Sequence, residues 1–150
     1  MVEKTFFSET ISINAPKSFI FNFLSDFSEN VKWVDGLKEE DVTPGKGEIK
    51  GTQIKETIFI HGHKWEYLEE VVECKDGEYL KINLGDKKEK IILDYTFTDG
   101  EYSNTLLTET ATIIEGSLIH RWLSGFDKFT LQKRLAKFKE VVEKEYNKSK

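Results

Sequence analysis

Residues 39–115 constrain the fold most, because their apolar side chains recur at almost every second position. Alternation with this period is typical of a β-strand that buries one face. Turn signals interrupt the alternation, among them Asp76-Gly77 and Asp99-Gly100, and Asp-Gly pairs favour tight hairpins. Because no helical pattern intervenes, we expect an antiparallel meander of six strands, over residues 39–43, 51–61, 63–74, 78–84, 89–98 and 103–115.

The two ends of the chain add one strand and three helical segments. Residues 5–13 alternate like a strand, and Pro16 then favours the start of a helix, followed by a second short helix over residues 28–34. A long helix is predicted over residues 118–146. Its apolar direction reverses across Phe129–Leu131, and Gly125 lies before that change, so either the helix bends at the glycine or its two halves face different apolar surfaces.

Composition narrows the class of protein. The 150 residues are predicted to form a single domain, 1–150, and 38% hydrophobic with 33% charged residues fits a globular chain. No apolar run reaches the roughly 18 residues of a membrane span, and the N-terminus has no signal-peptide pattern, so we expect a cytoplasmic protein. With only two arginines, nucleic acid is not an expected partner. The single cysteine, Cys74, excludes an intramolecular disulfide.

The order of elements and several short motifs resemble a known superfamily. The motifs are Ile11-Ser12-Ile13-Asn14-Ala15-Pro16, Leu24-Ser25-Asp26-Phe27, Trp33 and Tyr95-Thr96-Phe97. They are similar to the START-like (SRPBCC) superfamily, and within it to the polyketide cyclase/dehydrase and lipid-transport group. The resemblance implies an α+β helix-grip fold, in which a curved antiparallel sheet of about seven strands surrounds a long C-terminal helix, with two short helices after the first strand. It also implies a deep cavity that holds a hydrophobic or amphipathic small molecule.

Three glutamates lie in phase with the apolar face of a predicted strand: Glu9, Glu56 and Glu109. A carboxylate inside an apolar cavity has a raised pKa, and it can bind the polar group of a ligand or transfer a proton. Bulges or strand ends would instead place these groups in water. We take Glu56 and Glu109 as the polar anchors, because their neighbours are the more uniformly apolar.

Aromatic side chains are the candidate walls of the cavity. Trp65, Tyr67 and Tyr95 lie on predicted strand faces, Trp122, Phe126 and Phe129 lie on the first half of the last helix, and Trp33 is placed to close the cavity mouth. Ordinary core packing is the alternative for the same residues.

Other features suggest no cofactor and no metal. His61 and His63 flank a glycine at a predicted turn without a clear third ligand, and His120 is expected at the surface. Residues 118–150 hold nine Lys or Arg and four Asp or Glu, a net charge of +5 against −10 for the rest of the chain. These lysines solvate the outer face of the helix, or they meet an anionic membrane or an acidic partner.

The sequence therefore predicts a protein that binds a lipid- or polyketide-like small molecule in an internal cavity. Two alternatives stay open. One is a cyclase- or dehydratase-type enzyme with Glu56 or Glu109 as general acid or base. The other is a co-chaperone that resembles the Hsp90-activator relatives and would carry a large exposed apolar groove. Protein partners, the identity of the ligand and the oligomeric state are left open.

Overall fold

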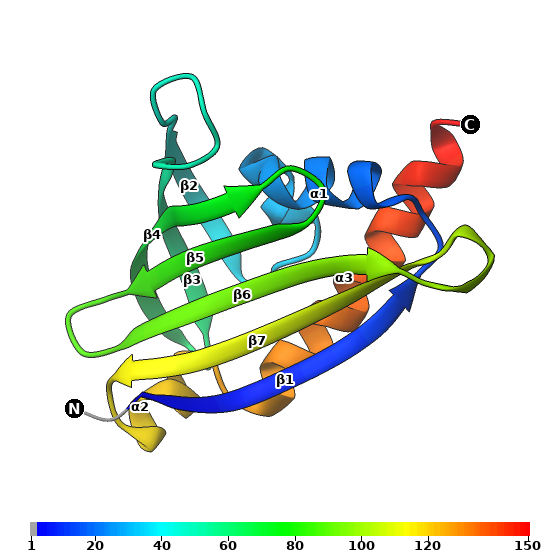
Figure 1. The fold of residues 1–150 in the computed structure, drawn as a ribbon. Helices are drawn as coiled ribbons and strands as arrows, with labels where there is room; N and C mark the ends of the chain where they lie inside the picture. Colours follow the sequence, from blue (N-terminus) through cyan, green and yellow to red (C-terminus); the bar gives the residue numbers. More distant parts are fainter. Residues whose placement is uncertain (1–2) are drawn as a thin grey trace.

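The computed structural model describes residues 3–150, in which seven strands form one antiparallel sheet (Figure 1). The strand order across the sheet is β1-β7-β6-β5-β4-β3-β2. The strands are β1 (Lys4–Ile13), β2 (Leu37–Thr43), β3 (Gln53–Ile60), β4 (His63–Lys75), β5 (Tyr79–Gly85), β6 (Lys90–Asp99) and β7 (Thr105–Glu115). The first and last strands in the sequence therefore pair, and the six predicted strands follow one another as a meander.

Helices occupy one side of this sheet (Figure 1). After β1 come α1 (Lys17–Ser25) and the 3₁₀ helix η1 (Phe27–Lys32), and a short 3₁₀ turn, η2 (Glu101–Ser103), joins β6 to β7. The chain ends in α2 (Leu118–Leu123) and α3 (Lys128–Lys148). The predicted helix-grip architecture is confirmed, with strand limits that differ from the prediction by no more than two residues.

The expected helix over residues 118–146 is interrupted between α2 and α3. Gly125 adopts a φ of +81°, and a Cβ atom there would come within 2.4 Å of Ile60 Cδ1, so only glycine suits the position. Asp127 then caps α3, since its carboxylate accepts a hydrogen bond of 3.0 Å from the Thr130 amide. The break lets the two helices face different surfaces.

The buried stripe of α3 packs against the sheet and the short helices. Leu131, Leu135, Phe138 and Val142 form this stripe at helical spacing. The Phe138 ring meets Trp33 edge-on at 5.0 Å and Phe23 at 5.9 Å. No helix formed by residues 3–150 combines the length and hydrophobicity that crossing a membrane requires.

Candidate functional site

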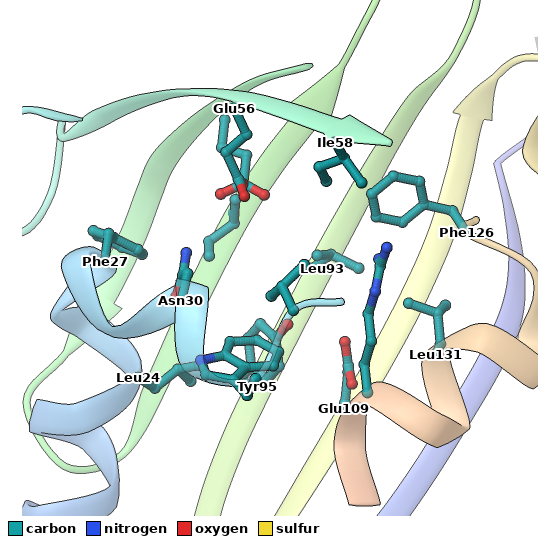
Figure 2. A pocket seen from close by; sticks show the side chains of 15 residues that line it. Leu24, Phe27, Asn30, Glu56, Ile58, Leu93, Tyr95, Glu109, Phe126 and Leu131 are labelled. Atoms are coloured by element: carbon teal, nitrogen blue, oxygen red, sulfur yellow. The ribbon is translucent and has the colours of Figure 1, made fainter. Parts of the chain in front are cut away.

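A small cavity lies between the sheet and the start of α3 (Figure 2). Its volume is about 40 Å³, enough for a few water molecules but far below the roughly 300–1,000 Å³ of typical ligand pockets. Its wall is mostly apolar, with polar groups from six elements. The lining residues are Leu24, Phe27, Asn30, Trp33, Val34, Glu56, Ile58, Glu69, Ile82, Leu93, Tyr95, Glu109, Phe126, Leu131 and Arg134.

Three buried carboxyl groups face this cavity: Glu56 on β3, Glu69 on β4 and Glu109 on β7. Glu56 lies opposite Tyr67 in the β3–β4 register, and Glu69 follows Tyr67 by two residues. The pleat points every second side chain the same way, so Glu56 and Glu69 are diagonal neighbours inside the sheet. Burial and the adjacent Glu56 carboxylate raise the pKa of Glu69 well above its ordinary value.

Glu109 lies across the cavity from Glu56 (Figure 2). Burial raises the pKa of Glu109 to about 7, although the Tyr95 hydroxyl and the Arg134 guanidinium favour its ionised form. On β2, opposite Glu56 in the β2–β3 register, burial together with the Glu56 and Asp26 carboxylates raises the pKa of Glu40 to about 7. Two carboxyl groups in the cavity lining, Glu69 and Glu109, therefore have raised pKa values, and that of Glu109 lies near neutral pH.

Other polar atoms in the cavity wall have no hydrogen-bond partner within the described part of the chain. They are Asn30 Oδ1, Trp33 Nε1 and Arg134 Nε, all buried. Asn30 donates only a long hydrogen bond of 3.4 Å to Glu40, and its side chain points toward Glu56 (Figure 2). Arg134 places its guanidinium over the Phe126 ring, 4.9 Å from the centroid. Buried polar atoms are nearly always paired in native proteins, so these atoms are available to a ligand.

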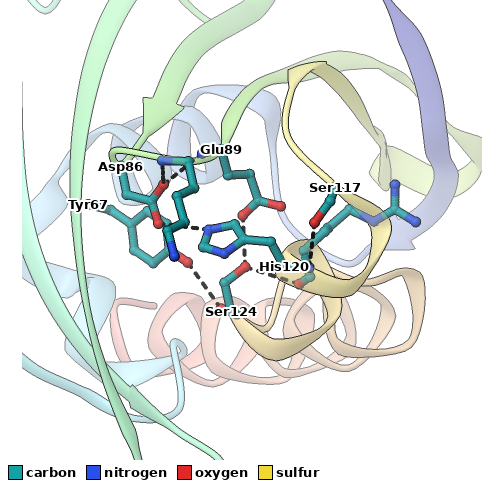
Figure 3. A network of polar contacts seen from close by, with 8 residues as sticks. Tyr67, Asp86, Glu89, Ser117, His120 and Ser124 are labelled. Atoms are coloured by element: carbon teal, nitrogen blue, oxygen red, sulfur yellow. Dashed lines mark hydrogen bonds and ion pairs between the residues drawn. The ribbon is translucent and has the colours of Figure 1, made fainter.

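A second polar region holds α2 against the turn between β5 and β6 (Figure 3). His120 Nε2 lies 3.0 Å from Asp86 Oδ2, and the Ser124 hydroxyl donates a hydrogen bond of 2.7 Å to Glu89. The Tyr67 hydroxyl donates to the Ser124 carbonyl at 3.5 Å. The expectation that His120 is a surface residue is wrong, because its side chain is only 12% exposed and is enclosed by this network.

Beside α2 runs an open groove of about 1,150 Å³, formed by β4, the β5–β6 turn and the end of β7. Trp65, Tyr67, His120 and Leu123 are among the residues that line it. The Tyr67 ring meets Phe126 edge-on at 5.0 Å, and Phe126 lines the inner cavity. This aromatic pair therefore separates the groove from the cavity.

The predicted site residues divide among three places. Five of them line the inner cavity: Trp33, Glu56, Tyr95, Glu109 and Phe126. Trp65 and Tyr67 line the outer groove instead.

Trp122 and Phe129 were expected in the cavity wall, and this placement is wrong. They are 56% and 66% exposed, because the break at Gly125 turns both away from the core. Trp122 stacks on His61 at 5.5 Å. Glu9 is half-buried opposite Glu109 in the β1–β7 register, outside the cavity lining.

Sequence reasoning missed Glu40, Glu69, Asn30 and Arg134. The alternation of Tyr67, Glu69 and Val71 on β4 carried the information for Glu69, and Arg134 follows Leu131 by one helical turn. Asn30 and Glu40 show no such pattern. Among residues 3–150, no group of three or more His, Cys, Asp or Glu side chains is arranged to hold a metal ion.

Comparisons with known proteins bear on the fold alone. No family model and no curated protein matches the chain. Solved structures do: a START superfamily protein from Mycobacterium smegmatis superposes with a TM-score of 0.76 at 16% identity, over 93% of this chain and 98% of that one. Ara h 8.0201 gives 0.71 at 12% identity, over 94% and 98% of the two chains.

A point mutant of Thalictrum flavum norcoclaurine synthase, solved with a transition-state analogue, also gives a TM-score of 0.71, at 10% identity and over 96% of each chain. At such low identities these similarities concern the fold, not the activity. The agreement spans nearly the whole chain in all three cases. The chain therefore has the START-like, or SRPBCC, helix-grip fold.

Proposed function

We propose that this protein binds an amphipathic small molecule between the sheet and α3. The observation that carries the proposal is the set of buried carboxyl groups of Glu56, Glu69 and Glu109, which face one cavity in an otherwise apolar wall. A purely structural core gains little from such groups, because burying a carboxyl costs free energy that the Glu56–Glu69 contact and the Tyr95 hydroxyl beside Glu109 only partly offset. A ligand with a polar group would satisfy them.

The apolar part of the ligand would lie against the aliphatic and aromatic wall. Ile58, Ile82, Leu93, Phe126 and Leu131 supply this surface from three strands, the loop before α3 and α3 itself. Burial of apolar area contributes about 25 cal/mol per Å². The apolar part of the ligand would therefore provide most of the affinity, and the carboxyl groups would fix its orientation.

Binding requires the cavity to enlarge, which would require the α2 segment to break the polar contacts that hold it against the β5–β6 turn. All six residues of α2 are half-buried or exposed. Displacement of Phe126 from Tyr67 would join the cavity to the open groove. The norcoclaurine synthase structure with its bound analogue supports this proposal, because it shows that a protein of this fold accommodates a small molecule.

The test combines a search for a retained ligand with a defined probe. Native mass spectrometry of freshly purified protein is expected to show an added small-molecule mass. Decanol is expected to displace the fluorophore N-phenylnaphthylamine from the stripped protein. Leu93→Phe fills the cavity and should weaken decanol binding at least about tenfold, whereas the control Leu106→Phe, on the opposite face of β7, should not. Absence of decanol binding, or equal binding by both variants, would refute the proposal.

A second candidate is an enzyme of the cyclase or dehydratase type, and the pKa of Glu109 near 7 favours it. A group that titrates near the working pH is suited to general acid or base catalysis. With the ligand identified by mass spectrometry as substrate, Glu109→Gln should lower turnover at least about a hundredfold while decanol affinity stays within a few-fold. Turnover that survives Glu109→Gln would rule out this role.

A further inference from the structure

The outer side of α2 carries large apolar side chains that are exposed to solvent. Leu118 and Ile119 are 68% and 72% exposed, and Trp122, one turn later, is 56% exposed. Positions i, i+1 and i+4 lie along one side of a helix, so these three residues form a single stripe, here called the α2 patch. Phe129, in the first turn of α3, adds a fourth apolar side chain that is 66% exposed. Proteins rarely expose contiguous apolar surface that has no partner.

Contacts on the other side of α2 fix the patch in this outward position. His120 Nε2 lies 3.0 Å from Asp86 Oδ2, and the Ser124 hydroxyl donates to Glu89 (Figure 3). The Trp122 ring itself is stacked on His61 of the β3–β4 turn, with 5.5 Å between the ring centroids. Figure 1 places α2 at the end of the molecule opposite the C-terminus, where a flat partner can reach it.

Positively charged side chains flank the patch on α2, on α3 and on the β5–β6 turn. Arg121 lies within α2, with its guanidinium 4.1 Å from the centroid of the Phe6 ring. Lys133 Nζ lies 5.2 Å from the centroid of the Phe129 ring. Neither cation forms an ion pair within residues 3–150, and the same holds for three exposed lysines nearby, Lys87, Lys88 and Lys128. These five cations are available to an external partner.

The acids of the same elements are, in contrast, engaged within the protein. Asp86 accepts hydrogen bonds from two amides of its own turn, and the Asp127 carboxylate accepts from Thr130. Glu115, at the end of β7, pairs with Lys90 at 3.5 Å. Residues 118–150 accordingly carry a net charge of +5, against −10 for the rest of the chain. The patch therefore lies in a cationic part of an otherwise acidic protein.

From this arrangement we infer that α2 docks on an anionic lipid surface. Leu118, Ile119 and Trp122 would enter the head-group region, and the surrounding cations would pair with the anionic lipids. Helices that bind a membrane interface combine an apolar side that carries Trp, Phe or Leu with a polar side rich in Lys and Arg. Tryptophan rings favour the head-group level, and each cation near an anionic surface strengthens binding by about fivefold. The inference does not depend on what the inner cavity binds.

A second copy of this chain suits the patch less well. If two molecules met through the same face, the cations of both would lie in one interface, where facing like charges weaken binding. The patch consists of three side chains on a helix of six residues, which is small beside the roughly 800 Å² that each partner buries in a stable protein complex. A lipid surface is fluid and supplies the opposite charge, so it meets both conditions.

The experiment measures binding to vesicles by co-sedimentation. The protein is expected to bind phosphatidylcholine vesicles that contain phosphatidylserine at least about tenfold more tightly than vesicles of phosphatidylcholine alone, and high salt should remove this difference. The double variant Leu118→Ser/Ile119→Ser should weaken binding at least about tenfold, because two exposed aliphatic side chains no longer enter the lipid. The matched control is Val31→Ser/Val42→Ser, two exposed aliphatic residues on η1 and β2, and it should bind like the wild type.

Charge variants test the cations separately. Lys128→Gln/Lys133→Gln should weaken binding to the phosphatidylserine vesicles at least about tenfold. The control Lys46→Gln/Lys50→Gln changes two exposed lysines between β2 and β3, away from the patch, and should leave binding within about threefold of the wild type.

Trp122 reports its own insertion. Of the three tryptophans in the chain, Trp33 is buried and Trp65 half-buried, so Trp122 is the one that lipid can reach. Brominated phosphatidylcholine in the vesicles is expected to quench the tryptophan fluorescence of the wild type. Trp122→Phe should abolish this quenching.

Several outcomes would overturn the inference. They are a lack of binding to the phosphatidylserine vesicles, equally tight binding to phosphatidylcholine alone, and binding that Leu118→Ser/Ile119→Ser leaves unchanged. Analytical ultracentrifugation without lipid tests the other occupant, because a dimer that this variant dissociates would assign the patch to self-association instead. Thermal unfolding shows that each variant is folded, as expected for exposed positions. Decanol binding tests the proposed function separately, so either proposal can fail without the other.

Discussion

Buried carboxyl groups occur in two regions of this protein, and their surroundings differ. Beside α2, Asp86 Oδ1 accepts hydrogen bonds of 2.6 and 2.7 Å from the Lys88 and Glu89 amides, Asp86 Oδ2 lies beside His120, and Glu89 accepts from Ser124. In the inner cavity, Glu56, Glu69 and Glu109 face one another and a single arginine. In the first region, donors of the turn, α2 and Ser124 pair with the carboxylates, although Glu89 Oε1 stays unpaired, whereas in the second region Glu69 lies beside another carboxyl, Glu56.

The contrast indicates what each region does. Hydrogen bonds of a buried polar network rigidify the chain, here by holding a short helix against a turn. Buried carboxyls that lie beside one another have raised pKa values and cost stability, which a protein tolerates where a ligand or a proton is exchanged. The α2 contacts are therefore structural, while the cavity carboxyls are the functional candidates. The following predictions test this division, beginning with the largest expected effect.

Removing the aromatic ring between the two regions should have the largest effect. Phe126→Ala deletes a buried ring that packs on Tyr67 and lines the cavity, so we expect a loss of about 3–5 kcal/mol in the free energy of unfolding. Urea unfolding measures it. Phe129→Ala, three residues away but largely exposed, is the control and should change stability by less than about 1 kcal/mol. Equal losses of stability for the two variants would contradict the placement of Phe126 in the cavity wall and of Phe129 on the surface.

The pH dependence of stability tests the carboxyls of the cavity. The pKa of Glu109 rises from 4.5 to about 7 on folding, so the folded state binds more protons than the unfolded state in that range. The stability that Glu109 contributes is complete below pH 4.5 and is lost as pH rises through about 7, by about 3 kcal/mol in total.

Glu109→Gln removes this dependence. We expect the wild type to lose about 3 kcal/mol relative to the variant between pH 4.5 and pH 8, by urea unfolding at each pH. Because wild type and variant are compared at several pH values, any pH-independent effect of the glutamine on the free energy of unfolding cancels. For Glu115→Gln, an exposed position on the same strand, the difference in free energy of unfolding from the wild type should not change with pH. A flat difference for Glu109→Gln as well would show that this carboxyl is not perturbed.

The hydrogen bonds beside α2 should stabilise the folded protein at pH 7, whereas the buried Glu109 carboxyl lowers its stability there. Ser124→Ala removes the donor to Glu89 Oε2 and leaves both oxygens of this buried carboxyl unpaired, so we expect a loss of about 2 kcal/mol at pH 7. A double-mutant cycle with Glu89→Gln should give a coupling energy of about 1 kcal/mol or more. Ser28→Ala, which removes an exposed hydrogen bond to Asp26, serves as the control with little effect. Additive effects at Ser124 and Glu89 would mean that the network does not hold α2.

Trp122 should give the smallest effect. Its ring stacks on His61 but is more than half exposed, so Trp122→Ala is expected to cost less than about 1 kcal/mol. Decanol affinity should also be unchanged, because Trp122 does not line the cavity. Titration and urea unfolding measure both quantities. A large loss of decanol affinity would place Trp122 in the binding site after all.

Much of the fold followed from local patterns. The alternation in β3 and β7 correctly predicted that Glu56 and Glu109 face inward, because the pleat fixes the side on which every second residue lies. Patterns failed where the chain is irregular. The alternation along β1 and β4 is shifted by bulges, between Thr5 and Phe7 and between Val71 and Glu73. The glycine break before α3 likewise reversed the expected place of Trp122.

The amino-acid sequence by itself determined the order of the elements, the antiparallel meander and the apolar stripe of α3, because backbone sterics and side-chain spacing act over a few residues. Only the tertiary structure decided which polar groups meet. Glu56, Glu69, Glu109, Asn30 and Arg134 come from β3, β4, β7, η1 and α3, and they share one cavity because the sheet curves around the last helix. Such encounters depend on the curvature of the sheet and on packing between distant segments, which no local periodicity encodes.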